Sequence, residues 1–423
     1  MRRRAQPPAG GPSSTAAIAA ALVVCLVVFA SCAGSGAGDQ PDDGVVGNRT
    51  LTVYSAMPLH GPARSVGRDS VNAIKLALEE AGGTAGPFEV NYVSLDDATA
   101  QAQTWTEDKV LDGARKAMED PSVIAYIGDL HSGATALALP ALNEVGVLQV
   151  SPASTYVGLT REGGGPNEPE RFYPSGRRTF ARMVPADHIQ AAAQVGYMGE
   201  RDVQRLALLH DGSLYGRSLA QQVRTVAEGE GIDVAGLSQV GGGGDEAAAA
   251  AEEVAALAPD AVLFAGTVDA DAADILDAVN DASPGADLFA PDGVATTAFT
   301  RRLSDAAAQR TFVTSPNLGP GVLPPAARRF AERFRATFGN APEPQALFAY
   351  EAMKAVLAAV ERAGLRGNDR RAVADQFLGI DRRDTVLGDY SIDRGGDIST
   401  TDYGGYRVRG DRLVFDTLLK VAT

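Results

Sequence analysis

The stretch GDLHSGATALALPALNEVGVLQVSPAST, residues 128–155, places one helical pattern between two loops, and each loop follows a short apolar run. The first loop contains Ser132 and Gly133. The second contains the small residues Ala153, Ser154 and Thr155. Short apolar runs that alternate with helices predict parallel strands with helical crossovers. Because the carboxyl ends of parallel strands share one edge of a sheet, we expect both loops to lie at that edge.

The same alternation extends in both directions from this stretch. LTVYSAMP, FEVNYVSLDD and VIAYIGDL are predicted strands, and DSVNAIKLALEEAGG and TEDKVLDGARKAMED are predicted helices. A Gly- and Pro-rich segment, residues 162–178, interrupts the pattern. A second series follows, with RLALLHD, AVLFAGT and RTFVTSPN as strands and DEAAAAAEEVAALAPD as the plainest helix. The sequence therefore predicts an α/β protein with two doubly wound units in tandem.

Length and composition agree with a two-domain globular protein. The chain has 423 residues, of which 22% are charged and 45% are hydrophobic, and chains of this length divide into domains. The formal net charge is −15. This charge argues against nucleic acid or an anionic membrane surface as a partner.

The first residues have the pattern of an export signal. Arg2, Arg3 and Arg4 precede the apolar run AAIAAALVVCLVVFASC, which has the length of a signal-peptide core. Its end, VFASC, resembles the lipobox of bacterial lipoproteins and marks Cys32 for lipidation, although Phe29 stands where that motif usually has Leu. The alternative is an ordinary signal peptide or a short membrane helix with an incidental Cys.

We therefore expect a lipoprotein signal peptide over residues 1–31 and a flexible tether over residues 32–49, which are rich in Gly, Ala and Asp. The only other cysteine, Cys25, lies inside the signal. The processed chain would have no disulfide.

The two small-residue loops suggest a site for an anion. The first turn of a helix has unpaired N–H groups and the positive end of the helix dipole, so it binds an anion without a charged side chain. The Ser132 hydroxyl can donate to an oxyanion, and Gly133 allows a close approach to the backbone. We expect a neutral site for a small carboxylate. The alternative is that Ser and Thr only cap the following helices.

Taken together, several motifs resemble one known family. MPLHGPARSVG, AIKLALEEAGG, GDLHSGAT, SPAST, LLHDGSLYGRS, FAPDGV and YEAMKAVLAAVERAG occur in the order and spacing of the branched-chain amino acid (Leu/Ile/Val-type) periplasmic binding proteins, the receptors of ABC importers. The resemblance covers residues 51–415. It implies the type I fold, in which two doubly wound parallel-sheet lobes are joined by a three-crossing hinge.

The resemblance also implies the extent of each lobe. Lobe 1 would comprise residues 50–184 and 315–388, and lobe 2 would comprise residues 185–314 and 389–423. The crossings would lie near Val184, Thr314 and Gly388.

By the same resemblance, the ligand carboxylate would be bound by Ser132 and Thr155 with the backbone at Ala153. Tyr215 and Asp292 in lobe 2 would meet its ammonium group. Asp292 replaces the Glu of the best-known members, and an Asp-Gly pair also forms a good turn. Tyr215 could instead be an ordinary packed aromatic residue.

Three departures from the family pattern bear on specificity. Val66 and Thr267 stand where relatives often have aromatic side chains, and His131 stands at the position of a family cysteine. The pocket for the ligand side chain is therefore expected to differ.

We predict a non-enzymatic receptor that captures an amino acid or related small carboxylate by cleft closure and delivers it to the transmembrane subunits of an ABC permease. It would be a monomer without metal or cofactor, exported and lipid-anchored to the outer face of the bacterial cytoplasmic membrane. One alternative is a sensor of the same fold that signals to a membrane receptor. The other is a secreted hydrolase with Ser132 as nucleophile, for which the adjacent His131 is poorly placed and no GxSxG motif is present.

Overall fold

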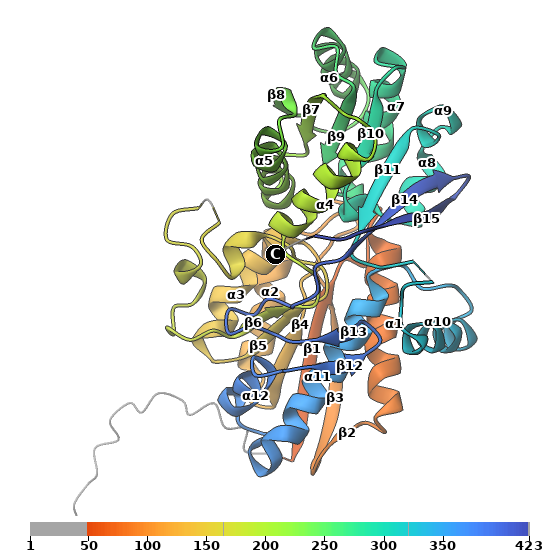
Figure 1. Ribbon diagram of the computed structural model, residues 1–423. Helices are drawn as coiled ribbons and strands as arrows, with labels where there is room; N and C mark the ends of the chain where they lie inside the picture. Colours follow the sequence, from red (N-terminus) through yellow and green to blue (C-terminus); the bar gives the residue numbers. More distant parts are fainter. Residues whose placement is uncertain (1–48, 164, 320, 422–423) are drawn as a thin grey trace, which may run out of the picture. The chain divides into compact units, whose positions relative to one another are not determined.

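The computed structural model describes residues 49–163, 165–319 and 321–421, and these residues form two large sheets covered by helices (Figure 1). The predicted signal peptide, Cys32 and nearly all of the predicted tether lie outside the described residues.

The first sheet has the order β2-β3-β1-β4-β5-β6, and all its pairings are parallel except that of β2 with β3. Its strands are β1 (Thr50–Met57), β2 (Thr84–Ala85), β3 (Phe88–Asp96), β4 (Val123–Ile127), β5 (Leu148–Ser151) and β6 (Phe180–Arg182). Helices α1 (Arg64–Glu80) and α11 (Ala346–Ala363) pack together, as do α2 (Glu107–Glu119) and α3 (Ser132–Glu144). Helices α10 (Pro325–Phe338) and α12 (Arg370–Phe377) complete this unit, which we call lobe 1.

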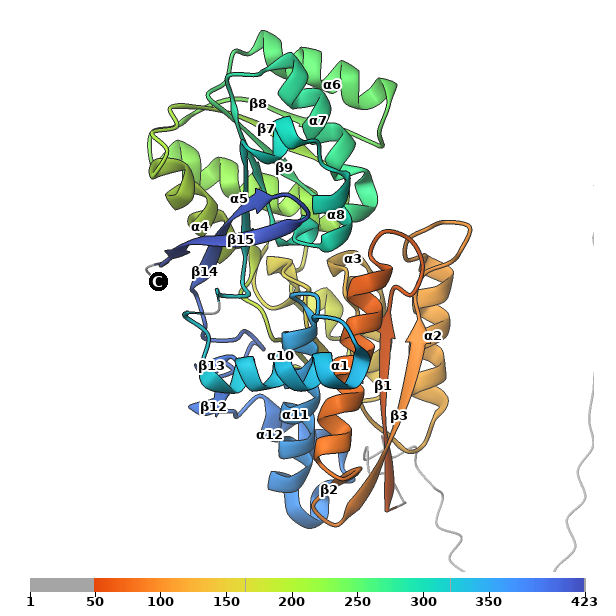
Figure 2. The same ribbon diagram turned by 90° about the vertical axis from the view of Figure 1, so that its right-hand side faces the viewer.

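Strand β1 shows why lobe 1 is a three-layer structure. Leu51 and Val53 belong to the hydrophobic cluster that contains α1 and α11, whereas Tyr54 and Ala56 belong to the cluster that contains α2 and α3. Successive side chains of a strand point to opposite faces. A central parallel strand that is apolar on both faces therefore needs helices on both sides, as Figure 2 shows.

The second sheet has the order β15-β14-β11-β10-β9-β7-β8. Its parallel strands are β7 (Arg205–His210), β8 (Asp233–Gln239), β9 (Ala261–Ala265), β10 (Asp287–Ala290) and β11 (Thr311–Ser315), and an antiparallel hairpin of β14 (Tyr403–Arg409) and β15 (Arg412–Leu419) extends its edge. Its helices are α4 (Asp187–Gly199), α5 (Leu214–Gly229), α6 (Asp245–Ala256), α7 (Ala272–Ala282), α8 (Thr297–Arg302) and α9 (Asp305–Ala308). We call this unit lobe 2. The predicted doubly wound α/β class is confirmed.

The chain passes between the lobes at three places. The first crossing lies between β6 and α4, and the second lies between β11 and α10. The third crossing is later than predicted. Gly388 begins β13 (Gly388–Tyr390), which pairs with β12 (Arg383–Thr385), and the side chains of Tyr390, Ile392 and Ile398 are buried in the hydrophobic cluster of lobe 1. We therefore move the predicted boundary from residue 388 to residues 399–402, because residues 389–398 pack on lobe 1.

The parallel strands of both lobes follow the same spatial order, in which the first strand lies between the second and the third. The chain therefore changes direction across the sheet next to β1 in lobe 1 and next to β7 in lobe 2. Open α/β sheets bind ligands outside the carboxyl ends of the strands at this switch point. The loops after β1 and β4, and those after β7 and β9, are the expected walls of a site.

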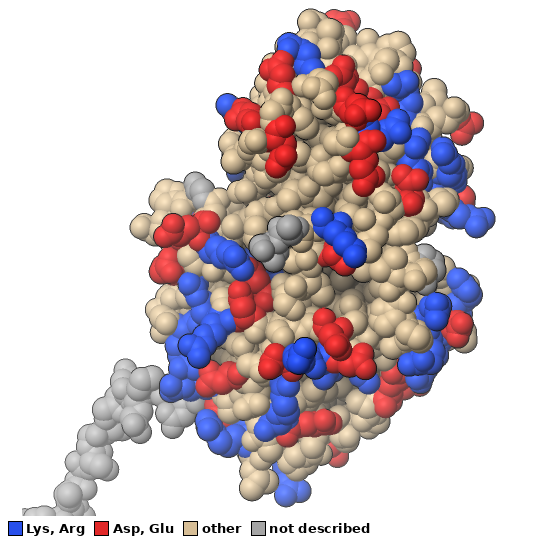
Figure 3. Space-filling view, viewed as in Figure 1, with Lys and Arg blue, Asp and Glu red and all other residues tan. Residues whose placement is uncertain are grey.

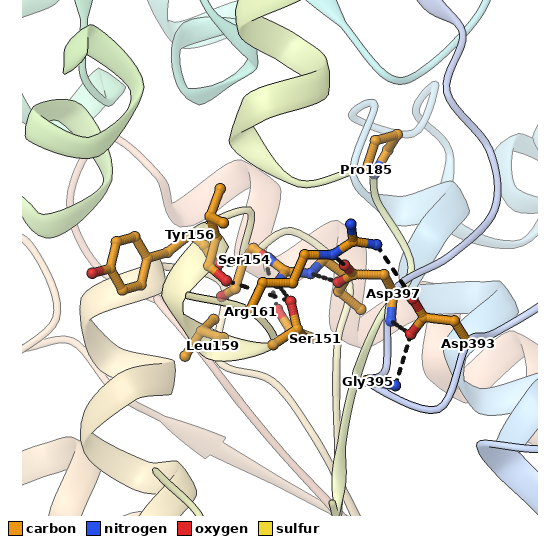
Figure 4. Close-up of polar contacts among 12 residues, drawn as sticks. Ser151, Ser154, Tyr156, Leu159, Arg161, Pro185, Asp393, Gly395 and Asp397 are labelled. Carbon is orange, nitrogen blue, oxygen red and sulfur yellow. Dashed lines mark hydrogen bonds and ion pairs between the residues drawn. The ribbon is translucent and has the colours of Figure 1, made fainter. Parts of the chain in front are cut away.

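A buried arginine fixes the loop after β5. Arg182 is 0% exposed. Its Nε donates to Asp397 Oδ1 at 2.8 Å, and Nη1 donates to the carbonyl oxygens of Ser154 at 3.2 Å and Tyr156 at 2.9 Å. Arg161 donates to the other oxygen of Asp397 at 2.6 Å (Figure 4). Burial acts to raise the pKa of Asp397, but the two guanidinium groups and the Thr160 hydroxyl hold it below its usual value.

We expect Arg182→Met to lower the free energy of unfolding by about 3–5 kcal/mol, because it leaves Asp397 and two carbonyl groups without their buried partner. Urea unfolding followed by circular dichroism measures this loss. Arg177→Met is the matched control, since Arg177 forms an exposed pair with Asp375 and its loss should cost less than about 1 kcal/mol. Equal losses in the two variants would contradict the role of Arg182.

Candidate ligand-binding cleft

A cavity of about 310 Å³ lies where the switch points of the two lobes meet. Lobe 1 contributes side chains from α1 and from the loops after β3, β4 and β5, and lobe 2 contributes side chains from the loops after β7, β9 and β10. Its size is at the lower end of the range of small-molecule sites, about 300–1,000 Å³. The cavity therefore suits a small ligand that touches both lobes.

Five of the seven residues predicted to bind ligand line this cavity: Ser132, Gly133, Ala153, Tyr215 and Asp292. Ser154 and Thr155 are buried and are not part of the lining. The predicted pairing of two loops at one sheet edge is therefore present, although the second loop reaches the cavity through Ala153.

The amino terminus of α3 faces the cavity without a side-chain cap at His131. The Ser132 hydroxyl oxygen accepts a hydrogen bond from the Tyr156 N–H at 3.3 Å, so its own proton is free to be donated. A Cβ on Gly133 would lie 2.9 Å from Cζ2 of Trp105. Glycine is thus required here because the indole ring lies against the first turn of α3.

Ser154 and Thr155 have other contacts. The Ser154 hydroxyl lies 2.7 Å from that of Thr135 and donates to the Asp129 carbonyl at 3.2 Å. Among the described residues, the Thr155 hydroxyl has no hydrogen-bond partner of good geometry. Burial raises the pKa of the nearby Asp187, and the Thr155 hydroxyl acts against this rise. These side chains shape the loop beneath the cavity wall.

Tyr215 and Asp292 form a pair on the lobe 2 side. The Tyr215 hydroxyl donates to Asp292 Oδ1 at 2.9 Å. Burial raises the pKa of Asp292 above its usual value, while hydrogen bonds from Tyr215 and Gln190 act against this rise. A Cβ on Gly293 would lie 2.9 Å from Cε1 of Tyr215, so the Asp-Gly turn is also what admits the tyrosine ring.

The cavity has an apolar wall that the sequence did not reveal. Trp105 lines it together with Val66, Leu214 and Val268. Trp105 is the only tryptophan of the chain and stands in the polar stretch AQTWTEDK, which is the one signal that could have singled it out. It provides an aromatic surface in a cavity where Val66 and Thr267 replace the aromatic residues expected from the resemblance.

Several further polar residues of the lining were also not predicted, among them Asp211, Gln345 and Asp269. Asp211 accepts hydrogen bonds from the Ser213 N–H at 2.9 Å and the Thr267 N–H at 3.0 Å, so it ties the loops after β7 and β9 together. Gln345, which precedes α11, has a buried side-chain oxygen without a hydrogen-bond partner among the described residues. Asp269 contacts lobe 1 across the cleft.

The geometry around Ser132 is not that of a nucleophile. His131 Nε2 lies 3.2 Å from Asp269, and its Nδ1 has no hydrogen-bond partner in the described part of the chain. A serine nucleophile needs a base within hydrogen-bond reach.

Among the residues that the structure describes, no group of three or more potential metal ligands is found. None of the helices in these residues is long and apolar enough to span a bilayer. On the face in Figure 3, side chains of both charges are interspersed.

Two doubly wound lobes with three crossings and a cleft at both switch points define a two-lobed solute-binding protein. Comparison of the sequence gives the same class: residues 55–411 match the periplasmic binding protein family, and this chain belongs to it. The predicted family and type I fold are confirmed.

Two sequence relatives are each 24% identical. The Leucine-, isoleucine-, valine-, threonine-, and alanine-binding protein of Pseudomonas aeruginosa aligns over 86% of this chain and 91% of its own length. The Leu/Ile/Val-binding protein of Escherichia coli K12 aligns over 84% of this chain and 89% of its own length.

Two solved structures share the fold. The leucine binding protein LivK of Thermotoga maritima has a TM-score of 0.75 and 22% identity, covering 87% of this chain and 98% of its own. A solute binding protein of an ABC transporter from R. palustris, in complex with benzoate, has a TM-score of 0.74 and 16% identity, covering 88% of this chain and 96% of its own.

Asp187, which lies beneath the cleft, should make the stability of the protein depend on pH. Burial raises the pKa of Asp187 to about 7, against about 3.9 in an unfolded chain. The folded protein therefore keeps this proton between about pH 4 and pH 7 while the unfolded chain loses it, and stability falls as the pH rises through that range. Asp187→Asn removes this ionisation. Between pH 4 and pH 8, its free energy of unfolding should therefore increase by about 2–4 kcal/mol relative to that of the unsubstituted protein.

Unfolding midpoints of both proteins at pH 4, 5, 6 and 8 measure this difference. Asp281→Asn, which changes an exposed carboxylate of α7, should show no such trend. A difference between Asp187→Asn and the unsubstituted protein that stays constant with pH would contradict the protonated state of Asp187.

Proposed function

We propose that this chain is the extracytoplasmic receptor of an ABC importer and that it captures an amino acid with an apolar side chain by closing its two lobes around it. The observation that carries the proposal is that the uncapped amino terminus of α3, with Ser132, and the Tyr215–Asp292 pair line one cavity from opposite lobes. A ligand with a carboxylate at one end and an ammonium at the other matches both ends.

The carboxylate would be bound by lobe 1. Its donors are the free hydroxyl proton of Ser132, the N–H groups of the first turn of α3 and the backbone at Ala153. Hydrogen bonds to a charged group contribute about 1.5–3 kcal/mol each. Ser154 and Thr155 would support this loop from behind, because their side chains are buried beside Asp129 and Asp187.

The ammonium would be bound by lobe 2. Asp292 is only 6% exposed and its pKa is raised by burial, so its ionised form needs a cation beside it. The Gln345 side-chain oxygen, which has no hydrogen-bond partner in the part of the chain that the structure describes, is a second acceptor. One sequence relative is named for binding leucine, isoleucine, valine, threonine and alanine, and one solved structure of the same fold is in complex with benzoate. A benzoate-like ligand has no cation for Asp292, and this favours an amino acid here.

The split of these groups between the lobes supplies the mechanism. An open form can bind the carboxylate or the ammonium, but only the closed form satisfies both, so ligand binding shifts the population toward closure. The apolar wall formed by Trp105 and its neighbours favours an apolar ligand side chain. Closure would create the surface that the transmembrane subunits of the permease recognise.

We expect Asp292→Ala to weaken binding of L-leucine, L-isoleucine or L-valine by at least about 2 kcal/mol, or about 30-fold, because the ligand ammonium loses its charged partner. Isothermal titration calorimetry measures this loss, with Asp281→Ala as the exposed lobe 2 control. The unsubstituted protein should also bind 4-methylpentanoate, which is leucine without its amine, more weakly than leucine. Equal affinity for the two compounds would exclude an ammonium site at Asp292.

Membrane anchoring through Cys32 is the second part of the proposal. In a bacterial host, the chain should incorporate labelled palmitate and sediment with membranes, whereas Cys32→Ser should be unlabelled and released. Cys25→Ser is the matched control and should remain labelled, because Cys25 lies within the predicted signal peptide. Labelling of Cys32→Ser would contradict lipidation at this position.

A further inference from the structure

Asp269 is a lobe 2 residue whose hydrogen-bond donors, among the described residues, come from lobe 1. It lies in the short 3₁₀ turn η3 (Val268–Ala270) that follows β9. Oδ1 accepts a hydrogen bond from the Ala63 N–H at 3.2 Å, and Oδ2 accepts one from the Thr104 hydroxyl at 2.9 Å. His131 Nε2 lies 3.2 Å from the same Oδ2. Separation of the lobes would therefore break every one of these contacts.

Two of the three partners of Asp269 lie at helix amino termini. Ala63 directly precedes α1, and His131 directly precedes α3. Neither helix has a side-chain cap at these positions. A carboxylate at such a terminus interacts favourably with the helix dipole. Lobe 1 thus binds the Asp269 carboxylate at helix amino termini, and the proposed function uses the same kind of site for the ligand carboxylate.

The surroundings of this contact are charged and buried. The side chains of Asp269 and His131 are 9% and 11% exposed. Burial opposes the charged form of each, but their mutual interaction holds the pKa of Asp269 below and that of His131 above the usual value. Asp97 after β3 and Asp129 after β4 also act on His131 from lobe 1, and Asp211 does so from lobe 2.

We propose that Asp269 is an interlobe latch: a carboxylate of lobe 2 that lobe 1 binds only in the closed form. This inference rests on closure as the binding mechanism. Asp269 acts as a positioning residue, since it lines the ligand cavity while its three partners belong to the protein. Its contacts add to the stability of the closed form and so increase the apparent affinity for any ligand that requires closure.

The chain contains its own reporter of closure. Trp105, the only tryptophan, follows Thr104 and lines the cleft. Its fluorescence quenching by acrylamide measures how open the cleft is, and calorimetry with L-leucine measures affinity. The test compares the full chain with Asp269→Ala and Asp269→Asn. Asp271→Asn is the control, because Asp271 bonds to Arg302 within lobe 2 and has a positive φ of 53° that Asn tolerates.

If the ligand-free protein is mostly open, we expect Asp269→Ala to weaken leucine binding about tenfold. If it is mostly closed, we expect the substitution to increase the quenching of Trp105. A shift in the population of the closed form must change one of these two quantities. Asp269→Asn, which keeps one oxygen acceptor, should fall between. At saturating leucine the quenching of Asp269→Ala should return to that of the unsubstituted protein, which a local folding defect would not do. Asp271→Asn should change neither quantity.

Unchanged affinity and unchanged quenching in Asp269→Ala would overturn the latch, as would quenching that saturating leucine fails to restore. Failure of the unsubstituted protein to bind any apolar amino acid would instead contradict the proposed ligand. The latch would then be judged by Trp105 quenching of the ligand-free proteins alone, where equal values for Asp269→Ala and the unsubstituted chain would overturn it.

Discussion

The buried guanidinium of Arg182 is the interaction on which the cleft depends. The loop after β5 turns away from the sheet, so its carbonyl groups have no strand partner, and Arg182 supplies donors to two of them. The same side chain pairs with Asp397 in the segment that leads to the third crossing. One residue at the end of β6 therefore fixes both a wall of the ligand cavity and the approach to the hinge, and it does so without exposure to solvent.

Lobe 1 uses helix amino termini repeatedly where negative charge is to be bound. The end of α3 faces the cavity with Ser132, and the Ala63 N–H at the end of α1 donates to Asp269, which the His131 side chain also contacts. Backbone N–H groups suit this task because they carry no net charge, so an empty site costs less than an unpaired buried lysine or arginine would. Under the proposed function, such groups would allow a strongly acidic chain to bind a carboxylate.

The features that depend on the local sequence pattern could be predicted from the sequence. The strands, the doubly wound class and the two small-residue loops followed from apolar runs and from Gly, Ser and Pro at their ends, and Ser132 lies where the pattern placed it. Trp105 and Asp269 were missed because their roles arise from contacts with distant segments. The third crossing was placed too early in the sequence. Ile392 and Ile398 have no strand pattern around them, so the sequence did not show that they pack on lobe 1.

The balance of charge beneath the cleft gives a further reason to connect the amine of the ligand with closure. Burial raises the pKa of Asp187 to about 7, and the charge of Asp292 acts in the same direction. Burial also raises the pKa of Asp292. Tyr215, which hydrogen-bonds Asp292, is buried as well and adds no positive charge. Closure over a ligand without an amine would bury these acids with no cation of the ligand to offset them. Under the proposed function, closure over an amino acid would bring an ammonium to Asp292 and lower the electrostatic cost of the closed form, whereas closure over a ligand without a cation would not.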